Sequence, residues 1–314
     1  CPPRPPPRCG ARRSAASAAA AEEGVTEPPT FAPFLAGPLP SGFVPLALIE
    51  GWDVSPDTRL LRYGLPAGAR SLAALGAPAG VKVRSEVAGQ VLDKSYSPVS
   101  HPAAEGHMDL LVKRYTPRPG GGLGAFLCDM EPGDQVDMKL KAPRNIGWAP
   151  YAPNRFADIV LVGAGTGVAP LMQLARAILE NPADQTRVHL VAAHRTERDV
   201  LLGDWLEDWA RRCPERFRAH VALSQPEQPH CWTAPGRSVG RVDLSCLRDF
   251  LPRPAASCAV LVCGTDGFLA DVCGAHIRVP VAGAAKLRKL QGPVRGMLAE
   301  LGFGGAAGDV VVKL

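Results

Sequence analysis

The chain has 314 residues, of which 46% are hydrophobic and 21% charged, so it is long enough for two domains with ordinary cores. Four arginines and no acid lie in residues 1–21, so most of the formal net charge of +5 belongs to that segment. The near-neutral remainder gives no support for a nucleic-acid partner. No apolar run approaches the roughly 20 residues that a membrane-spanning helix needs.

Residues 1–37 predict a disordered tail or an organellar transit peptide, because Pro, Ala, Arg and Ser dominate and the first acid is Glu22. We expect an organellar protein, in a mitochondrion rather than a plastid, and a monomer. The chain begins with Cys1 and not Met, so membrane association through a missing N-terminal segment, on the cytosolic side, is an alternative. The nine cysteines form no C-x-x-C pair, so we expect reduced thiols and no metal.

Residues 38–150 have the pattern of a small antiparallel barrel, in which short strands alternate apolar and polar residues between Gly- and Pro-rich turns. Residues 144–155 would link this barrel to the next domain. The segments with the strand pattern are Leu61–Leu65, Val81–Val87, His107–Tyr115 and Val136–Leu140.

The segment Ile159–Pro170 predicts a buried parallel strand, a glycine turn and the start of a helix. Gly163, Gly165 and Gly167 allow a sharp turn and a close approach of the backbone to a ligand, and Pro170 suits a first helical position. Such a turn presents free N–H groups to an anion, for which a nucleotide phosphate is the natural candidate. The third glycine of G-x-G-x-x-G is absent, and a turn that binds nothing is the alternative.

Residues 151–314 alternate strands and helices, which indicates an open parallel sheet with helices on both faces. Thr196 and Asp199 have the spacing of a capping box that would open a helix containing Leu201, Leu202, Trp205 and Trp209. Ligands bind such sheets beyond the carboxyl ends of the strands. Four of these ends should therefore converge: Gly163–Gly167, His194–Thr196, Ser224–Gln225 and Cys263–Gly267.

From about residue 43 onward, five motifs together resemble the ferredoxin–NADP reductase superfamily, and most closely the NADH–cytochrome b5 reductases. Lys94–Ser100 resembles the flavin motif R-x-Y-[ST]-x-x-S, and Leu111–Tyr115 the V-K-x-Y strand. Gly120–Gly124 is similar to the phosphate-contacting glycine turn of the family. Gly163–Pro170 resembles the nucleotide motif G-x-G-T-G-x-x-P, and Cys263–Gly264 the start of the C-G-P-P turn.

The resemblance implies a six-stranded antiparallel FAD-binding barrel over residues 38–150, then an open parallel-sheet NAD(P)H-binding domain over 151–314. It implies a reductase that passes hydride from NADH, or NADPH, to FAD and then passes single electrons to a protein acceptor. Cytochrome b5 is the first candidate for this acceptor. Alternatives are a reductase for a ferredoxin, a quinone or a nitrate reductase haem domain. A different class of protein, an inert flavin- or nucleotide-binding electron-transfer subunit, is also open.

The resemblance also assigns site residues. Tyr96 and Ser97 would contact the isoalloxazine, and Cys263 would lie near the path of the hydride. Lys94 and Lys113 would neutralise FAD phosphates or guide the nucleotide. The other implied FAD contacts are Pro98, Tyr115, Gly121, Gly122, Leu123 and Gly124. The implied nucleotide contacts are Gly163, Gly165, Thr166, Gly167, Pro170, Arg195, Ser224, Cys263 and Gly264.

The chain departs from the family pattern at four places. Lys94 stands where the family has an arginine, and Gly124 where it often has a serine. Thr265–Gly267 replaces the two prolines of the family turn, which would loosen that turn. Ser224 stands where NADH-preferring relatives carry an acid, so NADPH becomes admissible. A longer connection over residues 274–292 carries Arg278, Lys286, Arg288 and Lys289, and is expected to be a solvated loop or an acceptor-docking basic patch.

Overall fold

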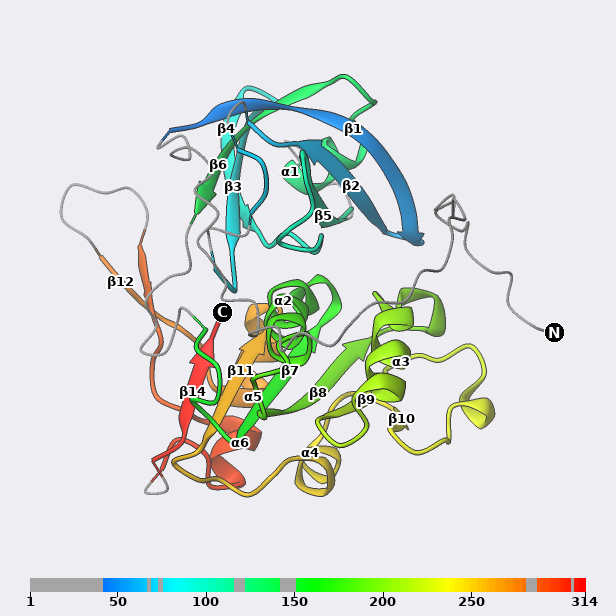
Figure 1. Cartoon of the computed structure of the whole chain (residues 1–314), viewed down its shortest axis with the longest axis vertical. Helices are drawn as coiled ribbons and strands as arrows, with labels where there is room; N and C mark the ends of the chain where they lie inside the picture. Colours follow the sequence, from blue (N-terminus) through cyan, green and yellow to red (C-terminus); the bar gives the residue numbers. More distant parts are fainter. Residues whose placement is uncertain are drawn as a thin grey trace, which may run out of the picture. The chain divides into compact units, whose positions relative to one another are not determined.

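The computed structural model describes residues 42–66, 69–72, 76–115, 122–141, 151–280, 287–305 and 308–314 (Figure 1). All of them belong to one compact unit, Phe34–Leu314. The predicted tail and most of the predicted linker lie outside the described residues. Within the described ranges, the helices are too short or too polar to cross a membrane.

The first half of the described chain folds into one six-stranded antiparallel sheet with the order β4-β3-β6-β1-β2-β5. A bridge between Pro98 and Leu110 joins the end of β4 to β5 and closes the sheet into a barrel. The expected six-stranded barrel is confirmed. The strands are β1 (Val44–Ser55), β2 (Thr58–Gly64), β3 (Gly80–Val87), β4 (Gln90–Tyr96), β5 (His107–Lys113) and β6 (Gln135–Lys141), and helix α1 (Leu123–Cys128) packs into the barrel core.

The alternating residues of the barrel strands explain its core. Val81 and Val83 of β3 and Met138 of β6 are fully buried, while their neighbours reach solvent. The long strand β1 has no clean alternation in the sequence, because its pairing with β2 shifts register near Glu50. Sequence periodicity therefore identified β3 and β6 but did not single out β1.

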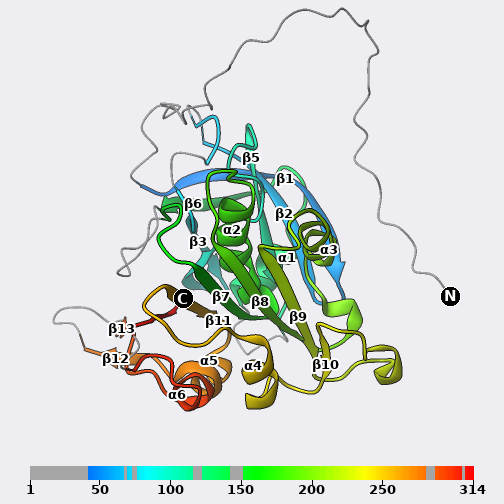
Figure 2. The same ribbon diagram turned by 60° about the horizontal axis from the view of Figure 1, so that its bottom comes forward.

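The second half contains a six-stranded parallel sheet with the order β10-β9-β8-β7-β11-β14, as expected (Figure 2). Helices α2 and α3 pack on one face, and α4, α5 and α6 on the other. The strands are β7 (Asp158–Ala164), β8 (Arg187–His194), β9 (Phe217–Leu223), β10 (Arg237–Val239), β11 (Cys258–Cys263) and β14 (Val310–Lys313). The helices are α2 (Val168–Leu179), α3 (Gly203–Arg212), α4 (Leu244–Phe250), α5 (Asp266–Cys273) and α6 (Gly296–Glu300), with 3-10 turns η2 (Gly165–Gly167), η3 (Glu197–Asp199) and η4 (Pro229–Cys231).

Two predicted helix starts were wrong. The capping box of Thr196 and Asp199 opens only the short turn η3, because Leu202 then adopts a left-handed conformation (φ 56°) and α3 starts at Gly203. Pro170 is the third residue of α2 rather than the first. It still lies in the first turn, where a missing N–H costs no intrahelical hydrogen bond.

The connection over residues 274–292 is not simply a loop. Strands β12 (Ile277–Val279) and β13 (Arg288–Leu290) pair as an antiparallel ribbon. Arg278 forms an ion pair with Asp266, and the Lys289 Nζ lies 3.6 Å from the same carboxylate. Two of its four cations are thus engaged with Asp266, while Lys286 lies outside the described residues.

Candidate active site

The glycine turn after β7 fits tightly against its surroundings. A Cβ on Gly163 would lie 2.8 Å from the Leu171 side chain, and one on Gly167 would lie 2.5 Å from the carbonyl oxygen of Cys263. Gly165 has a left-handed φ of 54° and open space beside it. Among the described residues no side chain caps this turn or α2, and the Val168 N–H is used within the turn, so the remaining N–H groups of the turn are the candidates for contact with an anion.

The four strand ends that the sequence singles out lie next to one another. Cys263 pairs with Gly163 across β11 and β7, and His194 pairs with Leu223 across β8 and β9. Beyond the strands, the Ser224 N–H donates to the His194 carbonyl (3.0 Å), and the Gln225 N–H to the Arg195 carbonyl (2.7 Å). The glycine turn, Arg195, Ser224 and Cys263 therefore share one edge of the sheet.

The barrel brings a second group of the expected residues together. The Lys94 ammonium lies 5.8 Å from the centre of the Tyr115 ring. A Cβ on Gly124 would lie 2.5 Å from the Lys113 carbonyl oxygen and 3.8 Å from the Tyr115 ring, so only glycine fits there. Gly122 precedes α1 beside open space, with Leu123 buried behind it, while Gly121 lies outside the described residues.

Tyr96 packs against the barrel core beside this group. Burial, together with the neighbouring Cys128 and Tyr115, raises the pKa of its phenol above the ordinary value of 10.0. The hydroxyl therefore stays protonated at neutral pH. It can donate a hydrogen bond while the ring offers an aromatic face or edge.

The segment that follows Tyr96 is held by helix α2. The half-buried Ser97 leads into Pro98, whose carbonyl accepts a hydrogen bond from the Gln173 side chain. The Arg176 Nη1 donates to the Val99 carbonyl at 3.0 Å, and Val99 joins the apolar core around α2. Helix α2 begins at the glycine turn, so one rigid element contacts both expected binding segments.

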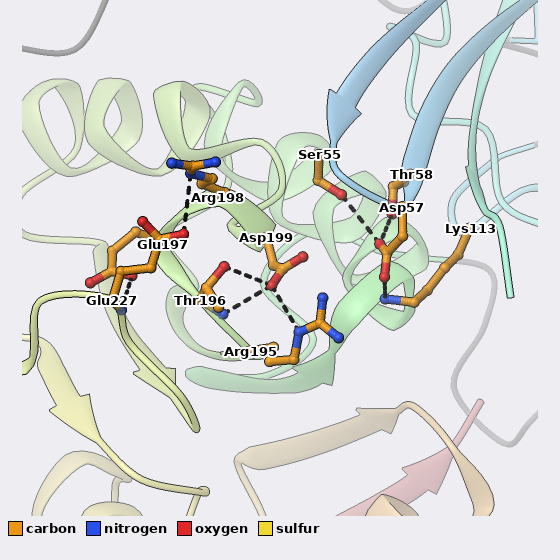
Figure 3. Close-up of polar contacts among 10 residues, drawn as sticks. All are labelled: Ser55, Asp57, Thr58, Lys113, Arg195, Thr196, Glu197, Arg198, Asp199 and Glu227. Atoms are coloured by element: carbon orange, nitrogen blue, oxygen red, sulfur yellow. Dashed lines mark hydrogen bonds and ion pairs between the residues drawn. The ribbon is translucent and has the colours of Figure 1, made fainter. Parts of the chain in front are cut away.

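The two lysines of the expected flavin site have different surroundings. Lys94 is exposed, whereas the Lys113 Nζ forms an ion pair with the Asp57 carboxylate at 2.7 Å (Figure 3). Burial alone would raise the pKa of Asp57, but the hydrogen bond and charge of Lys113, with help from Thr58 and Ser55, hold it below its ordinary value. The charge of Lys113 is therefore already balanced, and sequence reasoning missed Asp57 as its partner.

The acids near the ends of β8 and β9 are all engaged (Figure 3). Asp199 is buried, accepts from the Thr196 N–H and hydroxyl at 3.0 and 2.8 Å, and lies 3.4 Å from the Arg195 Nε. Glu197 accepts from the N–H groups of residues 227 and 228, and Arg198 pairs with Glu227 at 3.2 Å. Ser224 is exposed, and its N–H is bonded to the backbone at the end of β8.

Cys263 is suited to orient a ligand and not to attack one. Burial raises the pKa of its thiol to about 11, so it is protonated at neutral pH. In the turn Thr265–Gly267, which we expect to be looser without the two prolines, the Thr265 hydroxyl accepts from the Phe268 N–H at 3.3 Å and caps α5. A Cβ on Gly264 would lie 2.6 Å from the Phe268 ring, which fixes this turn further.

These features fit the two groups that the motifs imply. Gly122, which has open space beside it at the uncapped start of α1, and the nearby Tyr96 and Tyr115 suit a flavin nucleotide. The turn at Gly165 and the sheet edge suit a pyridine dinucleotide. A barrel with the first site, followed by a parallel sheet with the second, defines a two-domain flavin- and pyridine-nucleotide-dependent oxidoreductase.

Comparison with known proteins supports that class. Residues 45–144 match the oxidoreductase FAD-binding domain family, and residues 161–274 match the oxidoreductase NAD-binding domain family. The chain is 33% identical over 267 residues to NADH-cytochrome b5 reductase 2 of Botryotinia fuckeliana, covering 83% of this chain and 70% of the relative. It is 32% identical over 254 residues to NADH-cytochrome b5 reductase 1 of Lodderomyces elongisporus, covering 80% of each.

Solved structures agree. The cytochrome b5 reductase domain of Ulva prolifera nitrate reductase superposes with a TM-score of 0.68 at 26% identity, over 89% of this chain and 100% of that one. A ferredoxin NADP+ reductase from Neisseria gonorrhoeae, at 16% identity over 73% of this chain and 88% of that one, shares the fold with a TM-score of 0.56. The chain belongs to the NADH–cytochrome b5 reductase family. It is an oxidoreductase with an FAD-binding and an NAD-binding domain.

Proposed function

We propose that this oxidoreductase takes hydride from NADH and delivers single electrons to cytochrome b5. The observation that carries the proposal is the attachment of the flavin segment to helix α2, through Gln173 and Arg176. The glycine turn that would receive the nucleotide begins the same helix. The relatives named as NADH-cytochrome b5 reductases support the choice of donor and acceptor.

The chain's own residues supply binding and orientation. The N–H groups after Gly165 hold the pyrophosphate of the nucleotide, and the protonated thiol of Cys263 helps to fix the nicotinamide. Tyr96 and Ser97 orient the isoalloxazine, with Lys94 beside its phosphate chain. Bound FAD accepts two electrons together as hydride and can release them one at a time.

NADPH is a second candidate donor. No acid in the described part of this sheet edge is left unengaged, and the backbone of Ser224 and Gln225 bonds to that of His194 and Arg195. An acid at this edge would bind the ribose hydroxyls of NADH, whereas a nearby arginine suits the 2′-phosphate of NADPH. We therefore infer that discrimination against NADPH is weak.

The direct test uses the full chain with FAD, mixed anaerobically with NADH and, separately, with NADPH, while the flavin absorbance is followed. Rapid bleaching followed by reduction of added cytochrome b5 is expected. A protein that fails to bind FAD would overturn the proposal. Bleaching without reduction of cytochrome b5 would leave the reductase but reject this acceptor.

We also propose import into a mitochondrion directed by residues 1–37, with the protein acting as a monomer. The Arg- and Ala-rich, acid-poor composition of residues 1–21 supports this proposal. A fusion of residues 1–37 to a fluorescent protein should enter mitochondria. Cytosolic or plastid fluorescence would reject mitochondrial import.

A further inference from the structure

The ribbon of β12 and β13 has an aliphatic side that is open to solvent. In its register Ile277 lies opposite Leu290 and Arg278 opposite Lys289, and successive pairs point to opposite sides of the ribbon. Arg278 and Lys289 contact Asp266, so their side faces the turn after β11 and the Ile277 side faces away. Ile277 is 46% exposed and Leu290 is 38% exposed, and neither joins an apolar core among the described residues. Neighbouring exposed aliphatic residues, unlike single ones, indicate an interaction surface.

The buried Lys313 of β14 holds both ends of this ribbon. Its Nζ donates to the carbonyls of Ala275 and Pro293, at 3.2 and 2.9 Å, which lie before β12 and after β13. The Gln291 side chain also exchanges two hydrogen bonds with the Lys313 backbone, at 2.7 and 2.9 Å. The ribbon is therefore fixed to one strand of the sheet. A surface that is already ordered loses little conformational entropy when a partner docks on it.

The ribbon is fixed beside the sheet edge at which we propose that the nicotinamide binds. Lys313 pairs with Val262 in the register of β14 and β11, and Cys263 is the next residue of β11. Asp266, which the ribbon contacts, belongs to the turn that follows Cys263. A protein that docks on the ribbon would therefore lie next to this strand end.

The charge of the ribbon segment is opposite to that of the remaining sequence. Residues 272–299 contain five cations and no acid, a formal charge of +5. Residues 22–314 as a whole carry +1, so outside the ribbon segment they carry −4. Arg288 lies opposite Val279, which places it on the aliphatic side of the ribbon, and it is exposed. Aliphatic residues beside a positive charge fit a partner whose docking face is acidic around an apolar centre.

We propose that the aliphatic side of this ribbon, with Ile277, Leu290 and Arg288, is a docking surface for the protein that accepts the electrons, and that this partner presents an acidic face. The inference rests on the proposed function. The ribbon lies in the connection that is longer than in the family pattern, so docking on it is a property of this chain. A protein is favoured over an anionic membrane because an electron acceptor must come close to the cofactors, and the ribbon is fixed at their edge of the sheet.

The test measures reduction of cytochrome b5 by the full-length flavoprotein with NADH, at several ionic strengths. Arg288→Glu should raise KM for cytochrome b5 by about tenfold or more at low salt, because it brings like charges together, and salt should reduce the difference. The double variant Ile277→Ser/Leu290→Ser should raise KM at every ionic strength, since it removes the apolar contact. Flavin bleaching by NADH and the unfolding midpoint should be unchanged in both variants.

Two control variants change exposed residues elsewhere. Arg248→Glu makes the same charge change on α4, and Val91→Ser removes an exposed aliphatic side chain from β4. Both should keep KM for cytochrome b5 within about twofold of wild type, as rim residues outside an interface do. If the ribbon variants behave like these controls, the inference is overturned and the proposed function stands. Absent flavin bleaching in the wild-type protein overturns the proposed function instead, and bleaching without reduction of cytochrome b5 overturns this acceptor and its docking surface together.

A second measurement separates a protein partner from a membrane. Wild type and the ribbon variants are sedimented with vesicles of phosphatidylcholine and phosphatidylserine, and all should bind the vesicles equally. If the ribbon variants lose vesicle binding while KM for cytochrome b5 stays unchanged, the ribbon binds an anionic membrane and the inference is overturned.

Discussion

Gly167 lies directly against the backbone of Cys263, so that a single added carbon would come within 2.5 Å of the Cys263 carbonyl oxygen. The contact joins the turn after β7 to the end of β11, which pair in register up to Gly163 and Cys263. It sets the spacing between the N–H groups of the glycine turn and the Cys263 thiol, which we propose contact the pyrophosphate and the nicotinamide. The glycine is therefore required for the shape of the site, in addition to its flexibility.

Gly167→Ala should force these two turns apart. We expect a loss of about 1–3 kcal/mol in the free energy of unfolding, as for other overpacked sites, and a raised KM for NADH. Denaturant unfolding and steady-state kinetics measure the two effects. Gly203→Ala is the control, because a Cβ there would make only an ordinary 3.6 Å contact, and it should leave KM unchanged. An unchanged KM in Gly167→Ala would contradict the prediction.

Ser224→Asp should restore discrimination against NADPH. The new carboxylate would lie where the ribose 2′ position of the nucleotide is expected, and like-charge contact with a 2′-phosphate is costly. The kcat/KM ratio of NADH to NADPH should rise by about tenfold or more. Ser245→Asp adds the same charge on the exposed side of α4 and should leave the ratio unchanged. Equal ratios in the two variants would count against this placement of the ribose.

The ion pair between Asp57 and Lys113 should make stability depend on acid pH. The folded pKa of Asp57 lies below its ordinary value of 3.8, so its contribution is present above about pH 4 and is lost as the pH falls through the folded pKa. Asp57→Asn should cost about 1 kcal/mol at pH 7 and progressively less as the pH approaches 3. Thermal midpoints across pH 3–7 measure this dependence.

Asp53→Asn is the matched control for that series. Asp53 is largely exposed, and its contact with Arg59 is longer, at 3.5 Å. Its substitution should change the midpoint little at any pH. A difference between wild type and Asp57→Asn that stays constant from pH 7 to pH 3 would show that the ion pair does not titrate as described.

Cys263 should resist thiol reagents. Cys263 is only partly exposed, and its raised pKa, about 11, leaves a very small thiolate fraction at pH 7.5, whereas Cys231 is exposed. Peptide mapping after brief iodoacetamide treatment should find Cys231 modified and Cys263 intact. Labelling of both at similar rates would mean that Cys263 is more accessible than the structure indicates.

The sequence predicted what local patterns control. Alternation located β3 and β6, and an unbroken apolar run followed by glycines located β7 and its turn. What it missed depends on register and distant partners. Lys113 forms an ion pair with Asp57 only because β5 pairs with β2, and no pattern in the neighbouring sequence reveals that pairing. The burial of His194 depends on segments that cover the end of β8, since a histidine at a strand end can equally face solvent.

The contacts of helix α2 link the expected affinities for the two cofactors. Its first turn follows the glycine turn proposed to bind the nucleotide, and Gln173 and Arg176, one and two turns further on, donate to the carbonyls of Pro98 and Val99 in the proposed flavin segment. A ligand that fixes one end of this helix thereby restricts the other. If bound flavin changes the affinity for the dinucleotide by some factor, bound dinucleotide must change the affinity for flavin by the same factor. We therefore expect the occupancy of the dinucleotide site to influence how tightly the flavin is retained during turnover.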